Sequence, residues 1–266
     1  MGNFIISGLF IYPVKSLAGI PLQESVVDRC GLAFDRRWMV VDAEGRFLSQ
    51  RQLPRMALIQ QRILNDKLVL QVAGQTHLSL PLRPSGGEQV RVKVWDESCD
   101  AWYCGAEAEA WLTGFLGRPC RLVYMPYAHF RRVDQAYAGL EDRTAFSDGF
   151  PLLLISEASL EDLNRRLPEP VTMSRFRPNL VVAGCQPYAE DDWSRVKAGM
   201  LSLRVVKPCS RCAITTVNPV TAERGAEPLK TLSSYRRRGN KVYFGQNLLH
   251  DAEGHLSIGL QLEVLE

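Results

Sequence analysis

The chain has 266 residues, of which 46% are hydrophobic and 23% charged, and its formal net charge is +3. These values are ordinary for a soluble globular protein and fit one large domain or two small ones. We expect neither a nucleic-acid polymer nor a membrane as a partner. The net charge is small, the longest basic run is three arginines (236–238), and no run of ~20 apolar residues occurs.

The first hundred residues are typical of short antiparallel strands. Residues 3–12 are apolar but lack a preceding Lys or Arg and a small-residue cleavage site, so we expect a buried first strand rather than a secretory signal. Asn65-Asp66 predicts a turn between two strands. Further β-runs bounded by Gly, Asn and Asp are 26–27, 38–41, 58–64, 68–72 and 90–94.

Two helices and a long polar segment follow. The spacing predicts a helix over 106–116 with Gly117 as its stop, and a second helix from near Ser159, with Asp162 as its capping-box partner. Residues 127–148 lack periodicity, and loops of this length are usually functional or mobile. The last third returns to strands, at 180–182, 201–206, 214–217 and 262–265.

These patterns predict an α+β, strand-dominated and mostly antiparallel fold in two packed halves. We expect the halves to meet within residues 85–125, and we place the division at 1–120 and 121–266. Seven cysteines, an odd number without a disulfide-like framework, predict free thiols and a cytoplasmic location.

Cys209-x-x-Cys212 has several meanings when it is considered alone. A zinc knuckle needs two more ligands at comparable spacing, which the four histidines and other cysteines do not form. A thioredoxin-like pair needs a following helix, whereas the β-branched residues 214–217 favour a strand. A single thiolate beside Arg211 could bind a soft metal, because a neighbouring cation favours the thiolate. Two buried structural cysteines remain an equally open alternative.

Polar residues at strand ends form a second group of candidates. Lys15-Ser16, after the first strand, resembles a minimal phosphate cradle. Pro178 holds Arg177 on an extended segment, where a planar guanidinium suits a phosphate or a heterocycle edge, and Asn179 can donate and accept. Arg36 stands at another strand start. Each of these residues, taken singly, is as easily explained as a member of a surface ion pair.

Six motifs that occur in order along the chain favour a functional role for these residues. Together they resemble the MOSC family over residues 3–266. The resemblance is to its branch with a β-rich N-terminal extension, which includes the mitochondrial amidoxime-reducing component and the bacterial YcbX-like reductases. The motifs are Tyr12-Pro-Val-Lys-Ser16, Asp35-Arg-Arg-Trp38, Phe176-Arg-Pro-Asn179, Tyr188-Ala-Glu-Asp-x-Trp193, Cys209-x-Arg-Cys-x-x-Thr-Thr-Val217 and Phe244-Gly-Gln246.

The resemblance implies a barrel-like MOSC domain on a β-rich N-terminal subdomain, and a molybdenum cofactor (Mo-molybdopterin). In the family the second cysteine of the motif, here Cys212, ligates molybdenum. Asp148 matches a carboxylate near the site, a candidate for assisting proton steps, with Gly149 and Phe150 where the mitochondrial relative has hydroxyl side chains. The implied cofactor shell is Lys15, Ser16, Arg36, Arg177, Asn179, Ser210, Arg211 and Cys212.

The implied activity is the reduction of N-hydroxylated compounds, namely hydroxylamines, amidoximes and N-hydroxylated bases. No cysteine follows Cys212 and no Gly-x-Gly-x-x-Gly motif is present, so we expect electrons from a separate flavin or iron–sulfur protein. Two other possibilities stay open: sulfur carriage or cofactor handling through a Cys212 persulfide, and an interaction module without cofactor. The expected contacts for an acidic donor are Arg131, Arg132, Arg236, Arg237 and Arg238.

Overall fold

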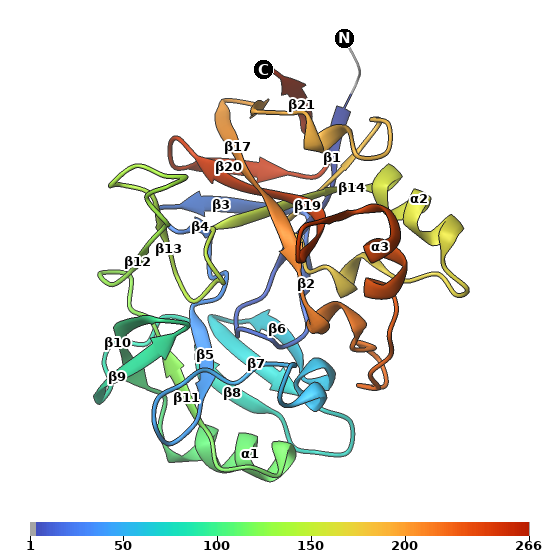
Figure 1. The fold of residues 1–266 in the computed structure, drawn as a ribbon. Coiled ribbons are helices and arrows are strands. Elements are labelled where there is room, and N and C mark those ends of the chain that lie inside the picture. Colours follow the sequence, from blue (N-terminus) through green and yellow to red (C-terminus); the bar gives the residue numbers. More distant parts are fainter. Residues whose placement is uncertain (1–3, 266) are drawn as a thin grey trace.

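The computed structural model describes residues 4–265, and Figure 1 shows two strand-rich halves, one above the other. The elements up to the middle of the chain are β1 (Phe4–Ile11), β2 (Ile20–Leu22), β3 (Glu24–Asp28), β4 (Gly31–Leu32), β5 (Trp38–Val41), η1 (Pro54–Leu58), β6 (Gln60–Leu64), β7 (Lys67–Gln71), β8 (Leu78–Pro81), β9 (Gln89–Val94), β10 (Glu97–Tyr103), α1 (Ala106–Leu116), β11 (Arg121–Tyr124), β12 (Arg131–Arg132) and β13 (Arg143–Thr144).

The remaining elements build most of the upper half. They are β14 (Leu152–Ser156), α2 (Glu157–Arg166), η2 (Met173–Arg175), β15 (Leu180–Ala183), η3 (Ala189–Asp191), β16 (Arg195–Ala198), β17 (Leu201–Arg211), η4 (Ala213–Thr216), α3 (Leu229–Tyr235), β18 (Arg237–Arg238), β19 (Lys241–His250), β20 (Gly254–Ser257) and β21 (Gln261–Val264). Helices α2 and α3 contact each other on the flank of this half (Figure 1).

Seven strands of the upper half close into a barrel. Their order is β14-β15-β1-β21-β16-β17-β19, and β19 pairs back with β14 to complete the ring. The β14–β15 ladder is parallel, and the other ladders of the ring are antiparallel. The inward side chains form one apolar cluster that includes Ile6, Leu9, Leu154, Val182, Leu203 and Leu248. The predicted strand-dominated α+β fold is therefore confirmed.

Gly245 allows the barrel to close. It lies in β19 with φ +79°, and a Cβ there would lie 2.6 Å from Ile155 Cγ1 and 2.8 Å from the Leu154 carbonyl oxygen. Both of these neighbours belong to β14. Only glycine combines a positive φ with such close approach of two backbones, so the Phe-Gly-Gln motif has a structural reason.

The lower half has its own core. Its sheets are β5-β11-β10-β9 and β6-β7-β8, and the buried face of α1 packs into the cluster that they enclose. The predicted helix over 106–116 is confirmed, and it ends at Gly117 in the left-handed conformation (φ +67°). The division at residue 120 stays a prediction. Strand pairing crosses this position, since β1 joins the barrel, β3 pairs with β20 and β11 joins the lower sheet.

The start of the second helix differs from the prediction. Its N-cap is Ser156, whose side chain accepts a hydrogen bond from the Ser159 amide, so the helix begins at Glu157. Ser159 instead donates its hydroxyl to the buried Glu190 carboxylate (2.8 Å). The capping-box pattern at Ser159 therefore predicts a helix start three residues too late, because the Glu190 carboxylate binds the Ser159 hydroxyl.

Candidate functional site

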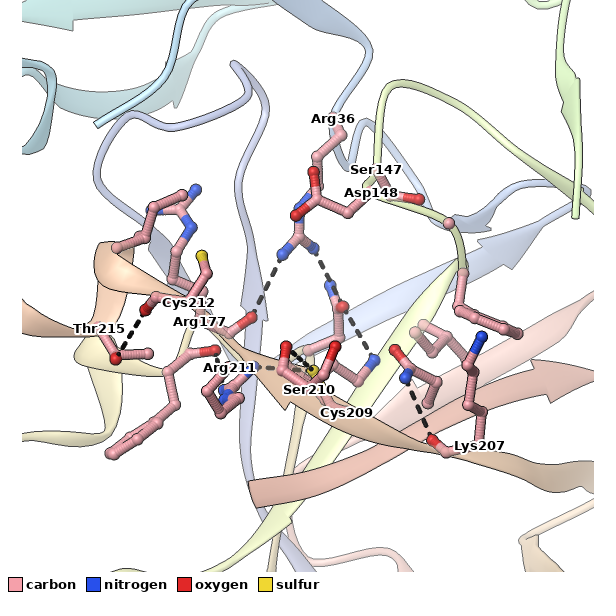
Figure 2. Close-up of a pocket in the computed structure, with 18 of the residues that line it drawn as sticks. Arg36, Ser147, Asp148, Arg177, Lys207, Cys209, Ser210, Arg211, Cys212 and Thr215 are labelled. Carbon is pink, nitrogen blue, oxygen red and sulfur yellow. Dashed lines mark hydrogen bonds between the residues drawn. The ribbon is translucent and has the colours of Figure 1, made fainter. Parts of the chain in front are cut away.

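One pocket of about 500 Å³ brings the predicted site residues together from both halves of the molecule. Figure 2 shows Lys207, Cys209, Ser210, Arg211 and Cys212 along the end of β17, with Arg36 and Asp148 facing them. All nine predicted residues line it: Lys15, Ser16, Arg36, Asp148, Arg177, Asn179, Ser210, Arg211 and Cys212. Their convergence from distant segments is a tertiary property that no single motif contains.

Irregular pairing of β17 directs the cysteine motif into this pocket. The register against β19 shifts twice, between Val205 and Lys207 and between Pro208 and Ser210. Proline cannot donate to a ladder, and bulges commonly re-aim side chains beside functional sites. The predicted strand over 214–217 is wrong, since Ala213–Thr216 is a short 3-10 helix.

Cys212 is held at its side chain and at its backbone. Arg51 donates from Nη1 to its Sγ (3.2 Å), and the Thr215 amide and hydroxyl both donate to its carbonyl oxygen (3.1 and 3.0 Å). A guanidinium beside the sulfur complements the negative charge that a metal-ligating sulfur carries. The sequence around Arg51 does not identify it as a site residue, because its partner lies 161 positions away.

Cys209 has a different environment. Arg211 donates to its Sγ from Nη1 (2.9 Å) and to the Phe176 carbonyl from Nη2 (2.6 Å). Burial raises the pKa of the Cys209 thiol, and the nearby Arg211 charge opposes that shift only in part. The two thiols are therefore not equivalent, since Cys209 anchors Arg211 while Cys212 faces the arginine of the lower half.

Arg36 and Asn179 form a buried network. Arg36 pairs with the buried Asp35, donates to Asn179 Oδ1 (3.0 Å) and donates to the Arg177 carbonyl (3.2 Å). Asn179 also accepts from the Leu153 amide (3.2 Å) and donates to the Phe10 carbonyl (3.1 Å). Both side chains thus hold β1, β14 and the site loops together as well as lining the pocket.

Tyr12 contacts two like charges. The Arg36 and Arg177 guanidinium carbons lie 4.3 and 4.2 Å from its ring centroid. Arg177 also donates from Nη1 to the Leu17 carbonyl (2.6 Å). Burial lowers the pKa of Arg177 to about 10, which still leaves it charged at neutral pH. Cation–π contact offsets part of the cost of holding two cations side by side.

Three pocket residues have strained backbone. Ser16, Arg36 and Arg177 have φ of +69°, +49° and +58°, in the left-handed region. The extended conformation expected for Arg177 before Pro178 is therefore wrong. Such conformations cost about 1–3 kcal/mol each for a non-glycine residue and cluster at functional sites. Their convergence here marks the pocket independently of the motifs.

Lys15 and Asp148 form a close ion pair at the pocket wall. Lys15 Nζ lies 2.5 Å from Asp148 Oδ1 and 2.7 Å from the Phe146 carbonyl oxygen. Burial lowers the pKa of Lys15 to about 8, although Asp148 opposes the shift. Enclosure would raise the pKa of Asp148, but the Lys15 ammonium, helped by Arg51 and Arg36, lowers it to about 2. Asp148 is therefore ionised at neutral pH.

The expected donor contacts need correction. Arg131 is only 6% exposed, because it binds Glu97 and donates to the Ser147 carbonyl (2.8 Å), and so fixes the segment that carries Asp148. Arg236 is held by Asp191 and stacks on Tyr188. The contacts that stay exposed are Arg132, Arg237 and Arg238.

The pocket suits an anionic ligand. Seven lysine and arginine side chains line it against two aspartates. Two buried nitrogens, Arg51 Nη2 and Arg211 Nε, have no hydrogen-bond partner among residues 4–265. Buried charged donors are rarely left unpaired, so these atoms indicate a missing acceptor. Within the described chain no three His, Cys, Asp or Glu side chains gather around a metal position.

Comparison with known proteins agrees with this organisation. Residues 3–119 match the family model of the MOSC N-terminal beta barrel domain, and residues 141–263 match that of the MOSC domain. Mitochondrial amidoxime-reducing component 1 of Homo sapiens is 38% identical over 96% of this chain and 81% of the human protein. Mitochondrial amidoxime reducing component 2 of Rattus norvegicus is 35% identical over 87% and 72%.

A more distant likeness is to the molybdenum cofactor sulfurase of Danio rerio. It is 34% identical over 93% of this chain but only 32% of the fish protein. None of the helices within residues 4–265 is long and apolar enough to cross a membrane.

Proposed function

This chain belongs to the MOSC family, in the branch with an N-terminal MOSC β-barrel domain, and from that we propose that it is a molybdenum-cofactor oxidoreductase that reduces N-hydroxylated compounds. The observation that carries the proposal is the pocket itself. It holds the Cys212 thiol beside the Arg51 guanidinium, with a dense set of cations around it.

The lining fits this cofactor. Cys212 would ligate the metal, and the unpaired nitrogens of Arg51 and Arg211 would meet acceptors of the pterin or its dithiolene. The pterin and its phosphate require cations and amide-like groups. The residues that would hold them are Lys15, Ser16, Arg36, Arg177, Asn179, Ser210 and Arg211.

The chain's own groups then prepare the reaction. When bound, the cofactor would supply two-electron reduction chemistry, and the net reaction turns N–OH, two electrons and two protons into N–H and water. The ionised Asp148 can accept a hydrogen bond from the substrate N–H or O–H. Lys15, with its pKa near 8, is the adjacent group that carries a proton at neutral pH.

A separate redox protein would supply the electrons. Transient electron-transfer encounters use small, charge-steered interfaces, and Arg132, Arg237 and Arg238 are exposed for an acidic partner. We expect turnover with dithionite and a viologen, none with NAD(P)H alone, and a donor-dependent rate that falls as salt rises. Robust activity with nicotinamide alone would refute the separate donor, whereas a rate insensitive to salt would refute only its electrostatic steering.

Metal analysis tests the function as a whole. Protein made in a cofactor-competent host should contain stoichiometric molybdenum and pterin and should reduce amidoximes and hydroxylamines. A labile sulfane sulfur on Cys212 without metal would favour the sulfur-carrier alternative, to which the sulfurase relative lends some support. All seven cysteines are free, which supports the proposal of a reducing, cytoplasmic location.

A further inference from the structure

A tryptophan occupies a turn position that glycine normally takes. The β9–β10 hairpin pairs Val94 with Glu97, so Trp95 and Asp96 form a two-residue loop. Trp95 alone of the two has positive φ (+56°), the pattern of a type II′ turn, in which the first central residue is usually glycine. A bulky residue in this region is strained, and such strain persists where the side chain has a use.

The Trp95 indole is rigidly held but not buried. The Arg51 guanidinium carbon lies 4.6 Å from its ring centroid, and the Phe47 ring meets it at 68° with centroids 5.0 Å apart. Even so, Trp95 is 47% exposed, and it lines the pocket described above. Trp38, a core tryptophan of the same half, is 0% exposed. Trp95 therefore acts as a wall of the pocket rather than as part of the core.

Trp95 is linked through one arginine to the sulfur that would ligate the metal. The arginine that stacks on Trp95 is the one whose Nη1 lies 3.2 Å from Cys212 Sγ. Arg51 thus lies between the indole and the metal-ligating sulfur, and a flat molecule against the exposed part of the indole would lie in the same pocket as Cys212. Concave sites that take small ligands combine an aromatic surface with a few polar groups, and here Arg51 and Asp148 supply the polar groups.

We propose that Trp95 is a specificity-determining residue, the stacking platform for planar, conjugated N-hydroxylated substrates such as aromatic amidoximes and N-hydroxylated heterocyclic bases. The inference rests on the proposed function and deepens it. Offset stacking rewards flat π-systems and gives nothing to a small aliphatic N-hydroxy compound. The platform therefore selects among substrates without taking part in the reduction.

The decisive variant is Trp95→Gly. Glycine suits the turn, so the variant should melt at the same temperature as the parent or higher, while the platform is removed. Binding is measured by calorimetry on oxidised, cofactor-loaded protein without reductant, so that no turnover occurs. The Kd for benzamidoxime should rise roughly 3- to 10-fold, and that for acetamidoxime should not change. Trp95→Phe, which keeps a ring, should retain most of the affinity.

Three results would overturn the proposal. An unchanged Kd for benzamidoxime would make Trp95 structural, and an equal loss for both amidoximes would remove the stacking argument. Loss of donor-dependent turnover alone, with normal Kd and normal viologen-dependent rate, would assign Trp95 to the protein partner. If the protein holds no molybdenum, the proposed function fails, but the same binding comparison on metal-free protein still decides the role of Trp95.

Discussion

Replacing Asn179 with alanine tests whether this residue is mainly a ligand-binding group or mainly a buried connector. Its side chain makes three hydrogen bonds, with Arg36, Leu153 and Phe10, and it is 1% exposed. Alanine would leave the Leu153 amide without an acceptor, which costs about 1–3 kcal/mol, and would weaken the support of Arg36. We therefore expect the cofactor-free protein to lose about 3 kcal/mol of unfolding free energy.

Urea unfolding of the cofactor-free protein, followed by circular dichroism, measures this loss. The matched control is Asn164→Ala on α2, outside the pocket. It removes two hydrogen bonds with Val171 and should cost about 1–2 kcal/mol without changing cofactor content. A loss below about 1 kcal/mol for Asn179→Ala, together with poor cofactor retention, would contradict the connector role and leave Asn179 as a ligand-binding residue only.

Other substitutions probe the thiols and the cations. Cys212→Ser should abolish N-hydroxy reduction and molybdenum retention, because an alkoxide is a harder and less acidic ligand, while Cys209→Ser should keep most of both; equal loss would indicate a paired-thiol site. Arg177→Lys should retain less pterin, since a point charge cannot replace a planar guanidinium stacked on Tyr12; equal pterin content would make Arg177 structural. Between pH 8 and 10.5 Lys15 is protonated in the unfolded chain but deprotonated in the folded protein. The free energy of unfolding of the parent should therefore rise with pH in this range, relative to that of Lys15→Met, by up to about 1.4 kcal/mol per pH unit. Urea midpoints at pH 7.5 and 9.5 measure this difference, and parallel curves would show that Lys15 is not perturbed.

Local sequence predicted well wherever the determinant was local. The helix over 106–116 follows from the spacing of the apolar residues within it and from Gly117 directly after it, so a short stretch of sequence contains both signals. Prediction was wrong where a distant group intervened. Ser159 resembles an N-cap, but Glu190 holds its hydroxyl. The β-branched run after Cys212 suggests a strand, but the Thr215 amide bonds back to the Cys212 carbonyl and forms a tight helical turn.

The candidate site, like the fold, could be predicted only in part from local sequence. Cys212, Arg177 and the other motif residues could be selected from the sequence by itself, because their chemistry and their order along the chain are properties of the sequence. Only the tertiary structure decided which cations face the pocket. Arg131 forms an ion pair with Glu97, 34 positions earlier in the sequence, whereas Arg51 contacts Cys212, 161 positions later. The strength of an ion pair depends on distance and burial in space, and neighbouring residues in the sequence carry no information about either.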